Sequence, residues 1–163
     1  MKQTHINIPF QIYPDLKSLD AADAQLMEAA RVATGHAYAP YSKFSVGAAI
    51  RLENGSILTG SNQENASFPA GICAERVTLS AASATFPGIA VTSLALTYIN
   101  VSGTGNRPIS PCGICRQTLA EYEQRFGRSI RLILGGFSGE IFLISRATDL
   151  LPFAFSSQEL KQL

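Results

Sequence analysis

The sequence is poor in charge, in cysteine and in long apolar runs. Charged residues make up 15% of its 163 residues, against about 25% in an average soluble domain, while 46% are hydrophobic. This balance excludes intrinsic disorder, and the shortage of charge indicates that another subunit covers part of the apolar surface. The net charge is +1, with no cluster of Lys or Arg. A nucleic-acid backbone or an anionic membrane is therefore not the expected partner.

Cysteine occurs only three times, as Cys73, Cys112 and Cys115. An odd number of cysteines does not fit a framework of disulfides. Met1–Phe10 contains no apolar segment of the signal-peptide kind, and Val91–Val101 is too short and too polar to cross a bilayer. We therefore expect a soluble protein of a reducing compartment, most simply the cytoplasm.

Helical and strand patterns alternate along most of the chain. Apolar spacing and turn residues predict a helix from Ser18 or Asp20 to about Ala37, strands at 44–52 and 56–60 joined by Asn54-Gly55, a helix at 72–84, a strand at 91–101, a helix at 112–126 closed by Gly127, strands at 130–134 and 140–144, and a helical turn at 147–151.

This order predicts an α/β fold with three layers (α/β/α). Its mixed sheet would have roughly five strands, with an antiparallel hairpin, partly parallel later strands and helices on both faces. Residues 1–17 contain Pro9 and Pro14 without clear periodicity, so we expect an extended arm there. Residues 18–163 would form a single domain.

Residues 112–115 have the sequence CGIC. Taken alone, this CxxC motif fits two buried thiols, a redox dithiol of the thioredoxin type, or half of a metal site with both sulfurs on one helix face.

Cys73 favours the metal site. Cys73 and the Cys112–Cys115 pair both fall at predicted helix starts, where the helix dipole lowers the pKa of a thiol. Zinc suits three thiolates, and three protein ligands leave a fourth position for water, as in catalytic zinc sites. Glu75, in the first turn after Cys73, is placed to move protons. It also fits a simple helix-terminal acid or a fourth ligand. Arg76 and Arg116 each follow a cluster, where they would donate hydrogen bonds to sulfur or lie solvated on the surface.

Four segments together resemble the zinc-dependent cytidine deaminases of the three-cysteine, homotetrameric kind. They span most of residues 20–155 and read YAPYSKFSVG (38–47), ENASFPAGICAER (64–76), SPCGICRQ (110–117) and LLPxxF (150–155). Gln63 stands where an apolar residue is usual, and Phe68 where Tyr is common.

The resemblance implies a role for each matching residue. Cys73, Cys112 and Cys115 match the ligands of one zinc ion per subunit, and Glu75 matches the proton shuttle. The substrate-binding positions are Phe44 beside the base, Ala74 as a backbone donor, Asn62 and Glu64 at the ribose 3′-hydroxyl, and Ala66, Phe68 and Phe155 reaching a neighbouring subunit's active site. Arg76, Arg116 and Gln117 are assigned to the surroundings of the metal.

The activity implied is hydrolysis of cytidine and 2′-deoxycytidine to uridine and 2′-deoxyuridine, with release of ammonia, in pyrimidine salvage. The negative charge of Glu64 near the sugar suits a neutral nucleoside and repels a 5′-phosphate. Four alternatives remain open: a deaminase of another aminopyrimidine such as blasticidin S, a zinc-stabilised binding module closed by Glu75, a redox dithiol protein, and a nucleic-acid editing deaminase. The last needs a basic groove that this composition does not supply.

Overall fold

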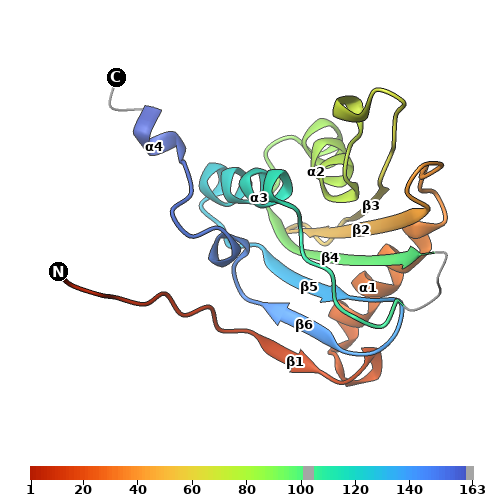
Figure 1. Ribbon diagram of the computed structural model, residues 1–163, viewed down its shortest axis with the longest axis horizontal. Helices are drawn as coiled ribbons and strands as arrows, with labels where there is room; N and C mark the ends of the chain where they lie inside the picture. Colours follow the sequence, from red (N-terminus) through yellow and green to blue (C-terminus); the bar gives the residue numbers. More distant parts are fainter. Residues whose placement is uncertain (101–104, 161–163) are drawn as a thin grey trace.

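The computed structural model describes residues 1–100 and 105–160, which build a mixed sheet between helices (Figure 1). Six strands form the sheet in the order β1-β6-β5-β4-β2-β3. Their bounds are β1 Gln11–Tyr13, β2 Phe44–Leu52, β3 Ile57–Ser61, β4 Val91–Asn100, β5 Arg131–Gly135 and β6 Ile141–Ile144.

Strand directions follow the predicted pattern. β2 pairs antiparallel with both β3 and β4, β4 pairs parallel with β5, and β5 pairs antiparallel with β6. The β2–β3 hairpin turns at Gly55, whose φ of 85° suits glycine. The mixed α/β fold expected from the sequence is confirmed.

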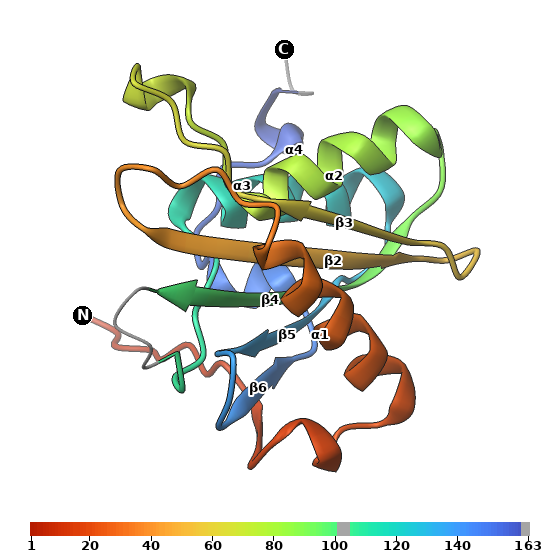
Figure 2. The same cartoon turned by 90° about the vertical axis from the view of Figure 1, so that its right-hand side faces the viewer.

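Helices cover both faces of the sheet (Figure 2). One face packs on α1 through a core that includes Leu26, Met27 and Ile133. The other packs on α2 and α3 through a larger core that includes Leu79 and Leu119. The helices are α1 Ala21–Thr34, α2 Ala74–Thr85, α3 Gly113–Phe126 and α4 Ser157–Leu160, with 3₁₀ turns at Leu16–Ser18, Phe68–Ala70 and Ala147–Leu150.

Helix ends largely match the sequence signals. Asp20 caps α1 by accepting the backbone N–H of Asp23 at 2.8 Å, and Gly127 ends α3 in the left-handed conformation with φ 60°. α1 ends at Thr34 rather than near Ala37, because the last predicted residues form a turn. α2 lies close to β3 at Gly60, where a Cβ atom would overlap the Thr78 hydroxyl. This close approach fixes the position of α2, whose N-cap is Cys73.

The expected strand number is too low, because Gln11–Tyr13, which the sequence pattern places in the arm, forms the edge strand β1. A strand of three residues next to two prolines has no local pattern, and its pairing with β6 joins segments about 130 positions apart in the chain. Val101, the end of the strand predicted at 91–101, lies outside the described residues. Among the described residues, no helix is long and apolar enough to span a membrane.

Candidate metal centre and active site

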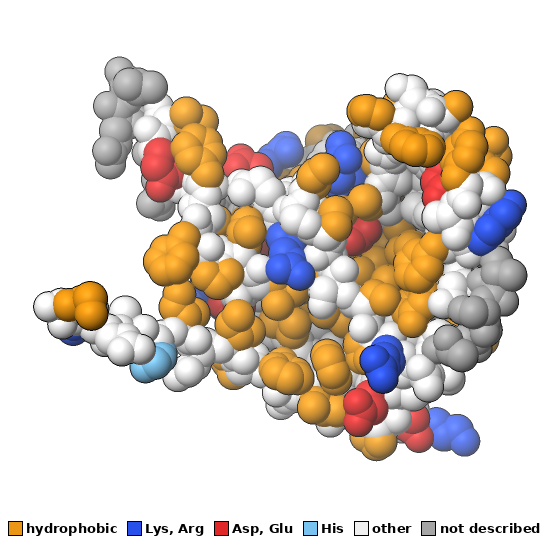
Figure 3. Space-filling view, viewed as in Figure 1, with side chains coloured by type: hydrophobic (Ala, Val, Ile, Leu, Met, Phe, Trp, Pro, Cys, Tyr) orange, Lys and Arg blue, Asp and Glu red, His pale blue; other side chains and the backbone are white. Residues whose placement is uncertain are grey.

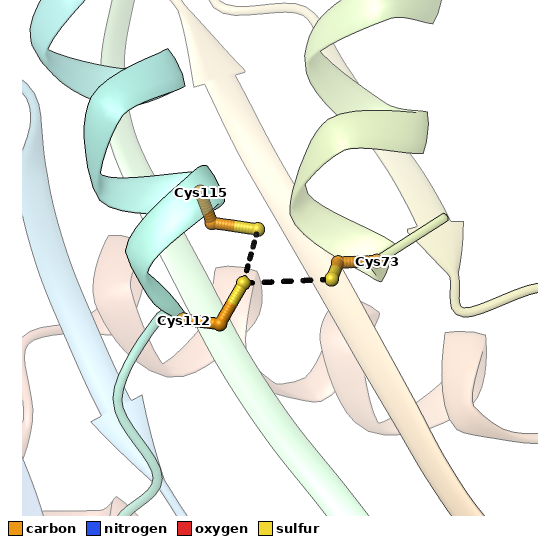
Figure 4. A group of neighbouring side chains, drawn as sticks. All are labelled: Cys73, Cys112 and Cys115. Atoms are coloured by element: carbon orange, nitrogen blue, oxygen red, sulfur yellow. Dashed lines mark hydrogen bonds between the residues drawn. The ribbon is translucent and has the colours of Figure 1, made fainter. Parts of the chain in front are cut away.

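Cys73 comes together with Cys112 and Cys115, which lie about 40 positions further along the chain, between the first turns of α2 and α3 (Figure 4). The Cys112 sulfur lies 3.7 Å from that of Cys73 and 3.5 Å from that of Cys115. All three thiols are free, and their sulfur atoms lie within 4.8 Å of one another. The fold thus creates one three-sulfur cluster.

Two helix N-termini supply this cluster. Cys73 is the N-cap of α2 and Cys112 is the N-cap of α3, while Cys115 lies one turn into α3. Neither cap side chain makes a capping hydrogen bond to the backbone of its helix, and both sulfurs face the cluster. Helix N-termini favour negative charge, and this arrangement therefore stabilises thiolates.

The geometry of the cluster fits a zinc ion. Tetrahedral zinc with Zn–S bonds of about 2.3 Å holds its sulfur ligands about 3.8 Å apart. The two closest sulfur separations, 3.5 and 3.7 Å, are near that value. Three soft donors at this spacing suit zinc better than a hard cation such as Mg²⁺.

The pKa values of the Cys73 and Cys115 thiols are shifted in opposite directions. Hydrogen bonding from Cys115 lowers the pKa of Cys73 to about 6, and the positive charge of Arg76 acts in the same direction. Donating that hydrogen bond, together with burial, raises the pKa of Cys115. The cluster already carries thiolate character at neutral pH, which is what a divalent metal requires of its ligands.

Glu75 lies in the first turn of α2, buried with 4% of its surface exposed. Burial raises the pKa of its carboxyl group, and the neighbouring Cys73 thiolate acts in the same direction. Among the described residues, the candidate metal ligands are the three cysteines and do not include Glu75. Its carboxylate thus lies beside the cluster without belonging to the three-sulfur group, and a buried carboxyl group with a raised pKa is typical of functional sites.

A cavity of about 420 Å³ opens onto the cluster and is large enough for a small ligand. Its wall is mostly apolar, with Cys73, Glu75 and Asn62 as convergent polar groups. The complete lining is Phe44, Val46, Asn62, Cys73, Ala74, Glu75, Leu96, Ile109, Ser110 and Cys112. The predicted zinc ligands, proton shuttle and base-binding residues thus meet in one place.

Asn62 holds the strand that carries Phe44. Its side-chain oxygen accepts the Val46 N–H at 2.7 Å, and its side-chain nitrogen donates to the Phe44 carbonyl at 2.9 Å. This pair of bonds extends the β2–β3 ladder through a side chain. An amide has a second N–H and a second lone pair, so Asn62 keeps bonding capacity for a ligand.

Glu64 holds the loop before β2. Its carboxylate accepts the N–H of Tyr41 at 2.8 Å and that of Ser42 at 3.3 Å. Bonding to Ser42, with backbone bonds to Tyr41 and Ser42, keeps the Glu64 pKa below its usual range. These contacts leave part of the carboxylate's capacity of about four acceptor sites unused.

A second cavity, of about 510 Å³, adjoins the first and shares Asn62 and Cys73 with it. Its wall also includes Glu64, Gln63 and the exposed ring of Phe68, which makes an edge contact with Tyr41. The side chain of Gln63 donates to the Ser61 hydroxyl at 3.1 Å and to the His36 carbonyl at 3.3 Å. The polar residue at this position is thus accommodated.

The residues assigned to the surroundings of the metal behave differently from one another. Arg116 donates to the backbone carbonyls of Pro111 at 2.8 Å and Leu150 at 3.3 Å, so it fixes the loop that leads to Cys112. The sequence had left open a bond to sulfur or a solvated position for this residue. Gln117 donates to the Phe155 carbonyl at 2.9 Å. Arg76 is the member of this group whose positive charge lowers the pKa of a cluster thiol, that of Cys73.

Two predicted substrate-binding residues lie away from both cavities within this chain. Ala66 is exposed, and Phe155 lies with Gln117 beside α3, along another hollow. This placement does not test their expected role, which is to reach a neighbouring subunit.

Sequence reasoning missed Tyr98, which is buried behind Phe44. The two rings are stacked with their centroids 4.7 Å apart. The alternation of Leu94, Leu96 and Tyr98 on one face of β4 was a usable signal, but the pairing of Val46 with Tyr98 that brings the rings together is a tertiary contact.

A mixed sheet with a three-thiol centre at two helix N-termini and a buried carboxylate beside it defines a zinc-dependent enzyme. Comparison with known proteins agrees. Residues 20–127 match the family described as the cytidine and deoxycytidylate deaminase zinc-binding region. The chain belongs to this family, which makes it a hydrolytic deaminase, and its cysteine cluster fits one zinc ion per chain.

Individual relatives support the assignment. A cytidine deaminase of Halalkalibacterium halodurans is 37% identical over 124 residues, covering 76% of this chain and 86% of its own. One of Sporosarcina psychrophila is 36% identical over 136 residues, covering 83% and 93%. The crystal structure of a cytidine deaminase from Burkholderia pseudomallei, 39% identical, superposes with a TM-score of 0.69 over 80% of this chain and 97% of its own.

Proposed function

We propose that the protein is a zinc-dependent cytidine deaminase that converts cytidine and 2′-deoxycytidine to uridine and 2′-deoxyuridine in cytoplasmic pyrimidine salvage. The observation that carries the proposal is the buried Glu75 carboxylate beside the three-sulfur cluster in one cavity. The cytidine deaminases among its relatives cover most of the chain and support the choice of substrate.

The reaction replaces the C4 amino group of cytosine by oxygen from water. Bound zinc, held by Cys73, Cys112 and Cys115, would lower the pKa of the attacking water. Glu75 takes a proton from that water and delivers it to ring N3 as the C–O bond forms at C4. Glu75 then passes the second proton to the amine, the C4–N bond breaks, and ammonia leaves. Burial of Glu75 favours this double role because it excludes competing water.

The cavities suggest how a nucleoside lies. The base would lie against Phe44 with its C4 edge toward the cluster, and the Ala74 backbone N–H would bond the ring edge. The sugar would extend toward Asn62, which borders both cavities, and Glu64, which borders the adjoining one. The charge of Glu64 disfavours a 5′-phosphate, so nucleosides are the proposed substrates rather than nucleotides.

A homotetramer with shared active sites is part of this proposal. The low charge fraction supports it, as do the exposed rings of Tyr41 and Phe68 beside the second cavity. Mixing Glu75→Gln chains with Phe68→Ala chains tests the sharing of sites. If Phe68 serves the neighbouring subunit, some mixed sites regain both residues and activity rises above that of either variant alone.

The direct test is ammonia and uridine formation from cytidine by the zinc-loaded full chain, with deoxycytidine, cytidine monophosphate and blasticidin S as competitors. Glu75→Gln should lower turnover by about 10²–10⁴-fold with zinc content unchanged. Glu140→Gln, a matched change at an exposed carboxylate, should have no effect. Wild-type protein that holds zinc but releases no ammonia from cytidine would overturn the proposal.

A further inference from the structure

The cysteines of the cluster belong to two separate helices, so the shape of the cluster depends on how these helices lie. Cys112 and Cys115 are both at the start of α3, and the geometry of that one helix terminus sets their separation. Cys73 is the N-cap of α2. The distance of 3.7 Å between the Cys73 and Cys112 sulfurs is therefore set by the placement of α2 against α3.

The sheet supports both helices through apolar contacts. Leu79 of α2 and Leu119 of α3 are fully buried in the same core. Figure 3 shows further hydrophobic side chains over the strands that lie next to α3 in the view of Figure 1. Because the hydrophobic effect is non-directional, such contacts hold the helices on the sheet without by themselves fixing one helix against the other.

Each helix also has a polar or close contact of its own with the rest of the fold. α2 lies close to β3 at Gly60. On α3, the Glu123 carboxylate accepts the backbone N–H of Ile130 at 2.6 Å and that of Ala147 at 3.0 Å. These bonds hold the C-terminal part of α3 to the segment before β5 and to the turn after β6. They do not join α3 to α2.

Tyr122 joins the two helices directly. Its hydroxyl lies 2.7 Å from the Leu79 carbonyl and 2.6 Å from the Ser83 hydroxyl, both of which belong to α2. A phenol has one hydrogen to donate, and a carbonyl can only accept. The Tyr122 hydroxyl therefore donates to Leu79, and the Ser83 hydroxyl donates to the Tyr122 oxygen. We call this pair of hydrogen bonds the Tyr122 link.

The Tyr122 link lies near the cluster. Leu79 is about six positions after Cys73, which corresponds to about 9 Å along α2. Tyr122 lies further along its own helix, but a long side chain in a helix points back toward the N-terminus. Its hydroxyl meets α2 within about two turns of the Cys73 N-cap. Hydrogen bonds are directional, so the link resists the sliding and rotation that apolar contacts permit.

We propose that Tyr122 is a positioning residue of the zinc centre. Its hydroxyl holds α2 against α3 so that the Cys73 sulfur meets those of Cys112 and Cys115. Glu75 lies on α2 next to Cys73, and the same link therefore sets the position of its carboxylate relative to the metal. Metal binding alone tests this role, which does not depend on cytidine being the substrate.

The test measures the zinc affinity of three variants of the full chain by competition with a chelator. Tyr122→Phe removes the hydroxyl and keeps the ring. We expect it to weaken zinc binding by about three- to tenfold, because the link can contribute no more to metal binding than the free energy of its hydrogen bonds. Ser83→Ala should weaken zinc binding less, since the bond from Tyr122 to Leu79 remains.

Thr118→Val is the matched control. It removes a hydroxyl-to-carbonyl bond of 2.9 Å that lies within α3, between Thr118 and Ile114, and it keeps the shape of the side chain. The variant should bind zinc like the wild type, because no bond between the two helices is lost.

Urea unfolding with and without zinc separates positioning from a purely structural role. Binding and folding are linked, so Tyr122→Phe should destabilise the zinc-saturated protein more than the metal-free protein. A purely structural bond would cost the same in both. Three results would each overturn the proposal: wild-type zinc affinity in Tyr122→Phe, an equal loss of affinity in Thr118→Val, or the same destabilisation with and without zinc. None of these measurements involves deamination, so a failure of the proposed reaction is distinguishable.

Discussion

The ring of Phe44 is stacked on the ring of Tyr98, with centroids 4.7 Å apart and planes 19° from parallel. Phe44 faces the cavity, and Tyr98 is buried behind it. Stacked aromatic pairs contribute about 0.5–1.5 kcal/mol beyond the area that they bury. Tyr98 therefore positions the aromatic wall against which the base would lie.

Tyr98→Ala should raise KM for cytidine by up to about tenfold, because Phe44 loses its support and the base loses a fixed surface. The fall in kcat should be smaller, since Glu75 and the cysteines do not move. Tyr98→Phe keeps the ring and should behave like the wild type. Steady-state kinetics on all three proteins measures this, and an equal loss in the Ala and Phe variants would contradict it.

Asn62→Ala should destabilise the protein by about 2 kcal/mol, because two hydrogen bonds to the Phe44 and Val46 backbone are lost and each contributes about 1 kcal/mol. Urea unfolding of the metal-free protein measures the change. Asn54→Ala is the control, since the Asn54 side chain accepts one exposed bond in the hairpin turn and should cost less. If the Asn62→Ala variant is as stable as the Asn54→Ala variant, the two hydrogen bonds of the Asn62 side chain contribute nothing to stability.

Removing zinc should lower the thermal midpoint, because the metal binds the folded cluster and the unfolded chain offers no such site. At a free zinc concentration of about 100 times Kd, the stabilisation is about 2.7 kcal/mol. Scanning calorimetry with zinc and with chelator measures the difference. Cys73→Ser should bind less zinc and lose most of this increment. An identical midpoint with and without zinc would contradict a metal held by the fold.

The contribution of Glu64 to stability should depend on pH. Its folded-state pKa lies below the usual 4.5, so the carboxylate is favoured by folding. The stabilising contribution is then fully present above pH 4.5 and is lost as pH falls through the lower, folded-state pKa.

Glu64→Gln should accordingly be less stable than the wild type at neutral pH, and the two should converge in acid. Urea unfolding of both proteins at several pH values measures this difference, and Glu53→Gln, which lacks bonds to the 41–42 loop, is the control. A stability difference between the wild type and Glu64→Gln that grows as pH falls would contradict a lowered pKa of Glu64.

Much of the fold is visible in local sequence patterns. The Asn54-Gly55 turn, the Asp20 cap and the Gly127 stop all act over a few residues, and each lies in the structure where expected. Local patterns do not predict β1, because its three residues are stabilised by pairing with β6, far away in the chain. An edge strand this short is specified by its neighbour rather than by its own periodicity.

The site also has some features that local sequence predicts and others that depend on tertiary packing. The residue types at 73, 75, 112 and 115, together with their position at predicted helix starts, are enough to indicate zinc chemistry. Arg116, for which the sequence left open a bond to sulfur or a solvated position, bonds two backbone carbonyls, because its loop and Leu150 lie within its reach in the folded chain. Tyr98 and the bonds of Glu64 to Tyr41 and Ser42 also depend on packing that no spacing rule describes.

By itself, the sequence indicated the class of chemistry, since three thiols and one carboxylate at these spacings suit a soft divalent metal and proton transfer and the surrounding motifs resemble those of zinc-dependent deaminases. It also determined the alternation of strands and helices, because hydrophobic periodicity is a local property. Only the tertiary structure decided that the three sulfurs lie within 4.8 Å of one another and that Glu75 is buried beside them. Distances and burial arise when separate helices pack on one sheet, and packing joins residues that the sequence keeps apart.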